Sequence, residues 1–106
     1  MSSHNHSRED FHSLLAATTG AEHIYYQPPA NVRMIYPCIE YHDQPWVSKF
    51  ANNKAYNICR HYQVTVIDPM PDNPWIMKLA SEIPMCTHSR HYTSDGLNHD
   101  VLDIYY

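Results

Sequence analysis

The chain has 106 residues, which is the size of one domain, and 43% of them are hydrophobic, so an intrinsically disordered chain is excluded. Its net charge is -4 with only 7 Lys and Arg, which disfavours a protein that grips nucleic acid through phosphates. Two glycines are too few for a phosphate-cradling loop, and no apolar run approaches the roughly 20 residues of a membrane span.

The start of the chain is polar, and residues 1–6 are predicted to form a flexible tail on a single domain that spans 1–106. These residues lack the apolar core of a secretory signal peptide, so we expect the chain to be made in a cytosol. Cys38, Cys59 and Cys86 would be free thiols there, and the simplest interpretation is that they are small buried hydrophobic residues.

Residues 8–19 are predicted to form a first helix. Ser7 and Asp10 have the spacing of a capping box, and Gly20 suits the position after the last turn. A helix this short is not stable alone and must dock its apolar side on a sheet. That side consists of Phe11, Leu14, Leu15 and Thr18.

Two strand-like stretches follow. Residues 23–26 are a short β-prone run that ends at consecutive prolines. Residues 32–42 are strand-like throughout, and Pro37 in their middle demands an edge position or a bulge because proline donates no ladder hydrogen bond. Residues 43–55 have no clean period and are predicted to form a long loop, a kind of segment that is usually functional or disordered.

Residues 56–84 are predicted to form a strand, a proline-rich turn and an amphipathic helix. Asn73 offers an N-cap, Pro74 suits the first helical position, and Pro84 ends the helix. Two apolar sets are expected to face the core: Tyr62, Val64 and Val66 on the strand, and Trp75, Ile76, Leu79, Ala80 and Ile83 on the helix.

The chain closes with a predicted hairpin. Residues 85–92 form one strand, Asp95 and Gly96 make the turn, and residues 97–106 return as the last strand. Taken with the two helices, this order predicts an α+β fold in which both helices pack on one face of a mainly antiparallel sheet.

One pair of short motifs could carry chemistry. Cys59 and His61 would share a strand face, as would Cys86 and His88, and on neighbouring strands the four could surround a zinc ion. The Cys-x-His spacing is unusual for zinc, and two unrelated strands with polar outer faces are the better explanation. Cys38 with a histidine as a thiol hydrolase has still less support. We therefore expect no metal, no cofactor and no catalytic residue.

Aromatic residues suggest an assembled protein instead. The chain has 9 tyrosines, mostly on predicted strands and on both sheet faces, and tyrosine is enriched in interface cores. Trp46, Phe50 and Tyr56, in and around the unpatterned loop, are candidate contacts to a neighbour, although the loop could instead fold back on its own sheet. Tyr105 and Tyr106 could dock at a subunit boundary or pair within the sheet.

Several segments in order resemble a known family: YYQPPANVRMIYPCIEY, FANNKAY, RHYQVTVIDPMPDNPW and the closing RHYTSDGLNHDVLDIYY. Together they resemble the tail terminator, or tail completion, proteins of the neck of long-tailed bacteriophages, over about residues 21–106. Each motif alone is weak, and their shared order makes the resemblance fairly specific. Gly96 stands where that family more usually has Asn, and either residue suits a turn with positive φ.

The resemblance implies a structural virion protein without an active site, whose fold is a sheet with helices on one face. Copies would form a ring, typically of six, that caps the tail tube, stops its growth and meets the head–tail connector or stopper. DNA would pass through the channel without specific binding, which fits the acidic balance. Assembly would occur in the host cytoplasm, away from any membrane. A head-completion stopper or adaptor is the alternative within the same machine, and a small metal-binding domain or enzyme is the alternative of a different class.

Overall fold

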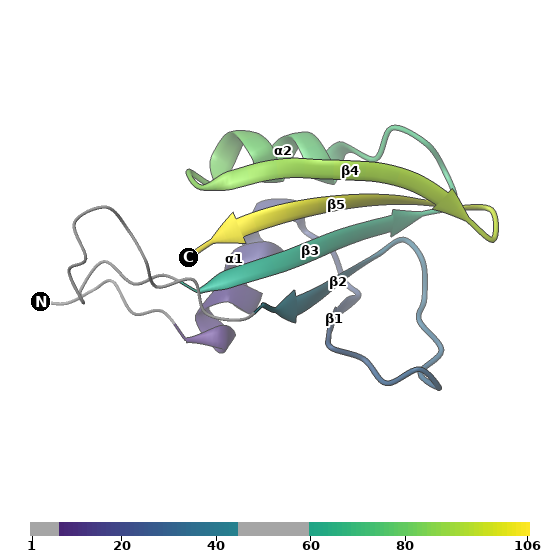
Figure 1. The fold of residues 1–106 in the computed structure, drawn as a ribbon, viewed down its shortest axis with the longest axis horizontal. Helices are drawn as coiled ribbons and strands as arrows, with labels where there is room; N and C mark the ends of the chain where they lie inside the picture. Colours follow the sequence, from purple (N-terminus) through teal and green to yellow (C-terminus); the bar gives the residue numbers. More distant parts are fainter. Residues whose placement is uncertain (1–6, 45–59) are drawn as a thin grey trace, which may run out of the picture.

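A single five-stranded sheet with two helices organises the chain (Figure 1), and the computed structural model describes residues 7–44 and 60–106 of it. The strands lie in the order β1-β2-β3-β5-β4, and every neighbouring pair is antiparallel except β1 and β2. The elements are α1 (Arg8–Thr19), β1 (Ile24–Tyr26), β2 (Cys38–Asp43), β3 (His61–Asp68), α2 (Pro74–Glu82), β4 (Cys86–Ser94) and β5 (Leu97–Tyr105).

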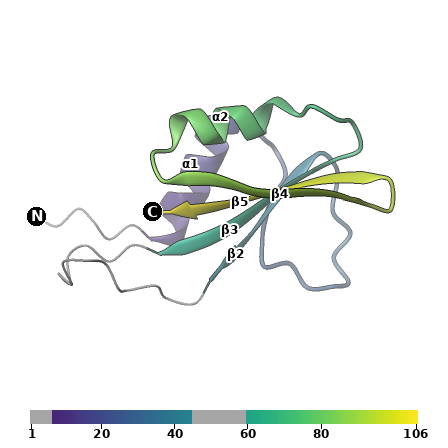
Figure 2. The same ribbon diagram turned by 45° about the horizontal axis from the view of Figure 1, so that its top comes forward.

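Both helices cover the same face of the sheet, as Figure 2 shows, and the other face, here the open face, carries no helix. The predicted α+β fold with two helices on one face of a mainly antiparallel sheet is therefore confirmed. Among the described residues, no helix is long and apolar enough to cross a membrane.

The helix ends are where the local signals placed them. The Ser7 hydroxyl accepts from the Asp10 N–H and the Asp10 carboxylate accepts from the Ser7 N–H, each at 3.1 Å, which completes the capping box. Gly20 ends α1 in the left-handed conformation, with φ of 75°. In α2 the Asn73 side-chain oxygen accepts from the Trp75 N–H at 2.7 Å, and Pro74 is the first helical residue.

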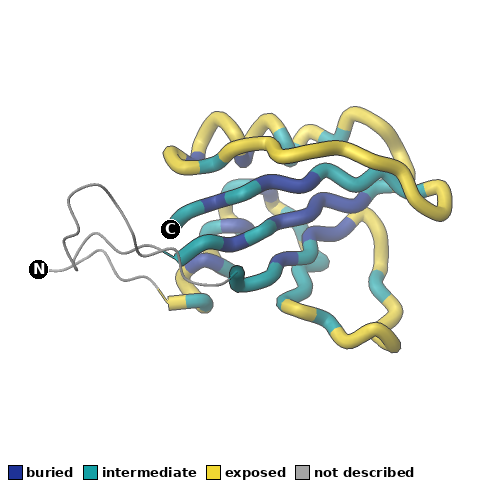
Figure 3. Tube along the Cα trace, in the orientation of Figure 1, coloured by how far each residue is buried: buried dark blue, intermediate teal, exposed yellow. Residues whose placement is uncertain are grey.

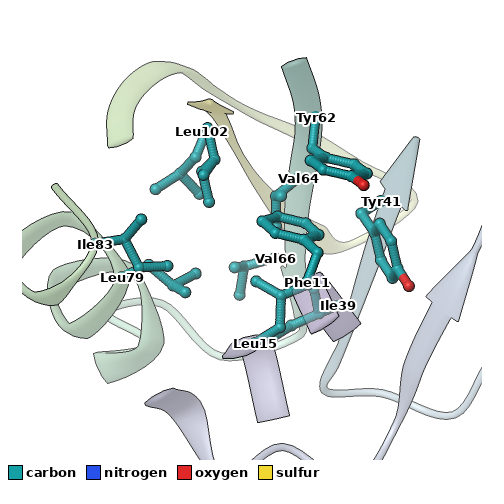
Figure 4. Packing of buried hydrophobic residues seen from close by; sticks show 11 residues of the cluster. Phe11, Leu15, Ile39, Tyr41, Tyr62, Val64, Val66, Leu79, Ile83 and Leu102 are labelled. Atoms are coloured by element: carbon teal, nitrogen blue, oxygen red, sulfur yellow. The ribbon is translucent and has the colours of Figure 1, made fainter. Parts of the chain in front are cut away.

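The core lies between the helices and the sheet (Figure 4). The Phe11 ring of α1 stacks on Tyr62 with ring centroids 3.9 Å apart. Two residues predicted on the apolar sides of the helices are placed differently. Ala80 of α2 is exposed, and in α1 the buried threonine is Thr19 rather than Thr18. The Thr19 hydroxyl can be buried because it donates to the Leu15 carbonyl at 2.7 Å. The buried cluster comprises Phe11, Leu15, Ile39, Tyr41, Tyr62, Val64, Val66, Leu79, Ile83, Leu102 and Ile104.

The strand expected over 32–42 is much shorter than predicted. β2 begins at Cys38, directly after Pro37, whose nitrogen can donate no ladder hydrogen bond. Residues 27–37 instead form a loop between β1 and β2. Asp43 still belongs to β2, so the loop predicted over 43–55 begins later than expected, and its residues from 45 onward lie outside the described residues, as does the predicted tail over 1–6.

The closing hairpin has the predicted turn. Asp95 and Gly96 both have positive φ, 54° and 75°, as a two-residue hairpin loop of the primed type requires. The turn closes between Ser94 and Leu97, two residues beyond the predicted end of the first strand. β4 also carries a register irregularity between His88 and Arg90.

Candidate interaction surfaces

The predicted interface residues divide into two groups. Trp46, Phe50 and Tyr56 lie outside the described residues. Tyr105 pairs with His61 in the sheet and stacks on its ring at 4.5 Å, and Tyr106 exchanges backbone hydrogen bonds with Arg60. The backbones of both tyrosines thus pair within their own sheet. Their half-buried rings leave an interface role as a prediction.

The three described members of the candidate zinc site, His61, Cys86 and His88, are not brought together. The strand β5 lies between β3 and β4, so the premise that the two Cys-x-His strands are neighbours is wrong. His61 points to the open face, where its Nε2 contacts Asp103 Oδ1 at 2.9 Å, whereas Cys86 and His88 lie on the helix-covered face. Cys59 lies outside the described residues, and no group of three possible ligands forms within the part of the chain that the structure describes.

The two described cysteines are poor nucleophiles. Burial, with a smaller contribution from Glu40, raises the pKa of the Cys38 thiol to about 12. Burial, helped by Asp103, raises the pKa of Cys86 to about 11. Both thiols are therefore protonated at neutral pH, and only the thiolate attacks an electrophile or binds a metal. The interpretation as small buried hydrophobic residues holds for Cys38, while Cys86 is half-buried.

Several tyrosines belong to the core rather than to an interface. Tyr41 and Tyr62 are fully buried, and Tyr26 lies 5.1 Å from the Tyr41 ring. The Arg8 guanidinium lies over the Tyr26 ring at 4.5 Å, and His12 Nδ1 lies 2.8 Å from the Tyr41 hydroxyl oxygen. Packing within the subunit therefore explains part of the tyrosine excess. A tyrosine ring fills core volume, while its hydroxyl group reaches polar partners at the edge of the core.

Exposed hydrophobic residues gather in two separate regions. The first is the loop 27–37, which exposes Val32, Ile35 and Tyr36, with Ile35 57% exposed. The second lies at the start and middle of α2 and exposes Met70 and Met77. Met85 is exposed at the other end of the helix, and Tyr92 is exposed on the open face, where it stacks on His99. The loop joins the edge strand β1 to β2, whereas β4 is the opposite edge strand, and Figure 3 shows both regions as largely exposed. The molecule therefore presents two different apolar surfaces at opposite edges of its sheet.

A groove lies within the second region, between the first turn of α2 and the helix-covered side of β4 and β5. It has a volume of about 340 Å³. Its floor holds Asp100, whose Oδ1 lies 3.0 Å from His88 Nε2 and 2.9 Å from His91 Nδ1. The groove is lined by Pro71, Asp72, Asn73, Ile76, Met77, His91, Asn98 and Asp100.

Sequence reasoning missed both the loop and the groove. The second half of the loop, residues 32–37, was assigned to an expected strand, although Pro37 was a signal against it. The groove unites residues from the turn before α2, from α2 and from both strands of the hairpin, and only the sheet order brings these together. Compared with protein-family models, with curated proteins and with solved structures, the chain finds no match.

Proposed function

We propose that this chain is a structural subunit of the neck of a long-tailed bacteriophage, namely the tail terminator that caps the tail tube and joins it to the head connector. Copies form a closed ring, with six as the number that the resemblance implies. The partners are other copies, the tail tube protein and the head–tail connector or stopper, and DNA passes through the channel. The chain acts in the virion and performs no catalysis.

Two observations support this proposal. The ordered motifs from Tyr25 to Tyr106 resemble that family, and the helix-backed sheet is the fold that the resemblance implies. The observation that carries most weight is the pair of unlike apolar surfaces at opposite edges of the sheet. A ring of identical subunits needs two different complementary faces on each subunit, because its contacts are heterologous.

The decisive experiment uses phage particles that lack this protein. For a terminator, we expect tail tubes of abnormal length, or tails that fail to join heads, and restoration when the chain is supplied from a plasmid. Tails of normal length beside heads that leak DNA would contradict the proposal and favour a stopper. Fully assembled, infectious particles would exclude both neck roles.

The alternative of a metal-binding domain is tested separately. Zinc in the purified chain is measured by elemental analysis after dialysis, with a Cys59→Ser, Cys86→Ser variant as control. The proposed function predicts a zinc content near zero in both. A stoichiometry near one that disappears in the variant would contradict it.

A further inference from the structure

We propose that the loop 27–37 of one copy docks into the α2–β4–β5 groove of the next copy. This inference rests on the proposed function in that it requires copies of the chain to associate. It adds the identity of the two contacting surfaces and their head-to-tail arrangement.

The loop has the properties of a preformed docking element. The Ile35 N–H donates to the Tyr25 hydroxyl at 3.0 Å, and the Val32 N–H donates to the Pro29 carbonyl at 3.0 Å, so the loop is tied to β1 and to itself. Prolines at 28, 29 and 37 restrict its backbone further. A segment held in this way loses little conformational entropy when it binds.

The charges of loop and groove are complementary. Arg33 is exposed and is the one charged residue between positions 27 and 37. The groove presents the carboxylates of Asp72 and Asp100, and its histidine lining residue, His91, contacts Asp100. An arginine entering this groove meets acceptors that suit the guanidinium fork.

The apolar parts also match in kind. Beside Arg33, the loop exposes Ile35, and the groove wall is made by Pro71, Ile76 and Met77, of which Met77 is 72% exposed. Covering Ile35 and Met77 together removes apolar surface from water on both partners. An unbranched methionine can adapt its shape to the incoming side chain.

The positions of the two surfaces decide the geometry of association. The loop lies beside the edge strand β1, and the groove lies beside the edge strand β4, at the far end of the strand order. One molecule cannot fill its own groove across the sheet, and two molecules joined once still leave one loop and one groove unused. Unless two copies exchange their loops reciprocally, the contact is heterologous, and it continues into a ring if the rotation between copies closes.

The test is sedimentation of the full chain at millimolar concentration. We expect the wild type to form oligomers larger than dimers, and Ile35→Asp or Met77→Asp to weaken association by about tenfold or more. Arg33→Glu should weaken it too, because it sets a carboxylate against those of Asp72 and Asp100. Met85→Asp and Arg90→Glu are the matched controls, because both residues are exposed and neither lines the groove. Circular dichroism verifies that each variant is folded.

A mixture of two variants tests the heterologous geometry directly. Ile35→Asp chains keep an intact groove and Met77→Asp chains keep an intact loop, so mixing them should give a dimer and nothing larger. No dimer in the mixture would overturn the inference, and so would wild-type behaviour of the single variants.

The inference and the proposed function fail in distinguishable ways. A wild-type chain that stays monomeric at millimolar concentration overturns the inference, and the particle experiment then still decides the function. If Ile35→Asp nevertheless prevents tail joining in particles, the loop docks on a different virion protein. Conversely, loop-in-groove oligomers from a chain that phage do not need for tails would contradict the function alone.

Discussion

At the scale of single residues, two buried tyrosines differ in what their hydroxyl groups contact. The Tyr41 hydroxyl oxygen lies 2.8 Å from His12 Nδ1 and 3.5 Å from Arg8. The Tyr62 hydroxyl oxygen is buried, and within the described part of the chain it has no partner of hydrogen-bond geometry. Burial raises the pKa of Tyr62, and the nearby Arg60 guanidinium opposes this without reaching that geometry.

Removing each hydroxyl should therefore have unequal effects. Tyr41→Phe breaks a made hydrogen bond and should lower the free energy of unfolding by about 1 kcal/mol. Tyr62→Phe removes a buried polar atom without a good partner and should change it by less than about 0.5 kcal/mol, or raise it. Urea unfolding of both variants beside the wild type measures the difference, and equal losses would contradict the contrast.

The Cys38 thiol should make the free energy of unfolding fall as the pH rises through the alkaline range. Its pKa is raised from 9.0 to about 12 by burial, so the unfolded chain loses this proton at a lower pH than the folded chain. The unfolded state is thereby favoured as pH rises, and stability present below about pH 9 should be lost progressively up to about pH 12. Tyr41 and Tyr62 have raised pKa values and act in the same direction.

The measurement is the slope of unfolding free energy against pH. Cys38→Ala should be less stable at pH 7, because a buried side chain is shortened, and should show a shallower slope in the alkaline window. Cys86→Ala is the matched comparison and should flatten the slope over a narrower range, up to about pH 11. A wild-type slope in Cys38→Ala would show that this thiol does not carry the effect.

At the scale of elements, the parts that sequence reasoning predicted well are those with local causes. The capping residues of both helices lie within four residues of the helix ends. The turn at Asp95 and Gly96 depends only on the ability of these two residues to adopt positive φ. The stretch 32–42 failed because β-prone side chains in residues 32–36 suggested a strand, while Pro37 prevented the pairing. Strand length depends on a partner, which local patterns do not reveal.

The cap of α2 gives a prediction at this scale. Asn73 accepts from the Trp75 N–H at 2.7 Å, and its amide donates to the Asp68 carboxylate at 2.6 Å, so it ties the helix to the end of β3. Asn73→Ala should lower the free energy of unfolding by about 1 to 2 kcal/mol. Asn73→Ser keeps a cap acceptor and loses the Asp68 contact, and should fall between Ala and wild type.

Chemical denaturation of the three proteins checks this order. Met77→Ala, at an exposed position of the same helix, is the control and should change stability by less than about 0.5 kcal/mol. A serine variant as unstable as the alanine variant would show that the contact to Asp68, rather than the cap, holds this end of α2.

At the scale of the whole molecule, the sheet order is the feature that local patterns could not predict. β5 inserts between β3 and β4, which separates the two Cys-x-His strands and brings Asp100 toward α2. The two ends of the fold also meet, because the Phe11 ring of α1 lies 5.7 Å from the ring of Tyr106. Pairings between distant parts of the chain create the groove, whereas the loop 27–37 arises from local prolines.

Association through opposite edges should make thermal stability depend on concentration. A folded subunit that binds its neighbours, while the unfolded chain does not, gains about 1.4 kcal/mol for each tenfold rise in concentration above the dissociation constant. The unfolding midpoint of the wild type should therefore rise between micromolar and millimolar chain. Ile35→Asp should match the midpoint of dilute wild type and show a smaller rise with concentration, because Ile35 is 57% exposed and contributes little to the isolated fold. Met85→Asp should follow the wild type, and a concentration-independent wild-type midpoint would contradict association of the folded chain.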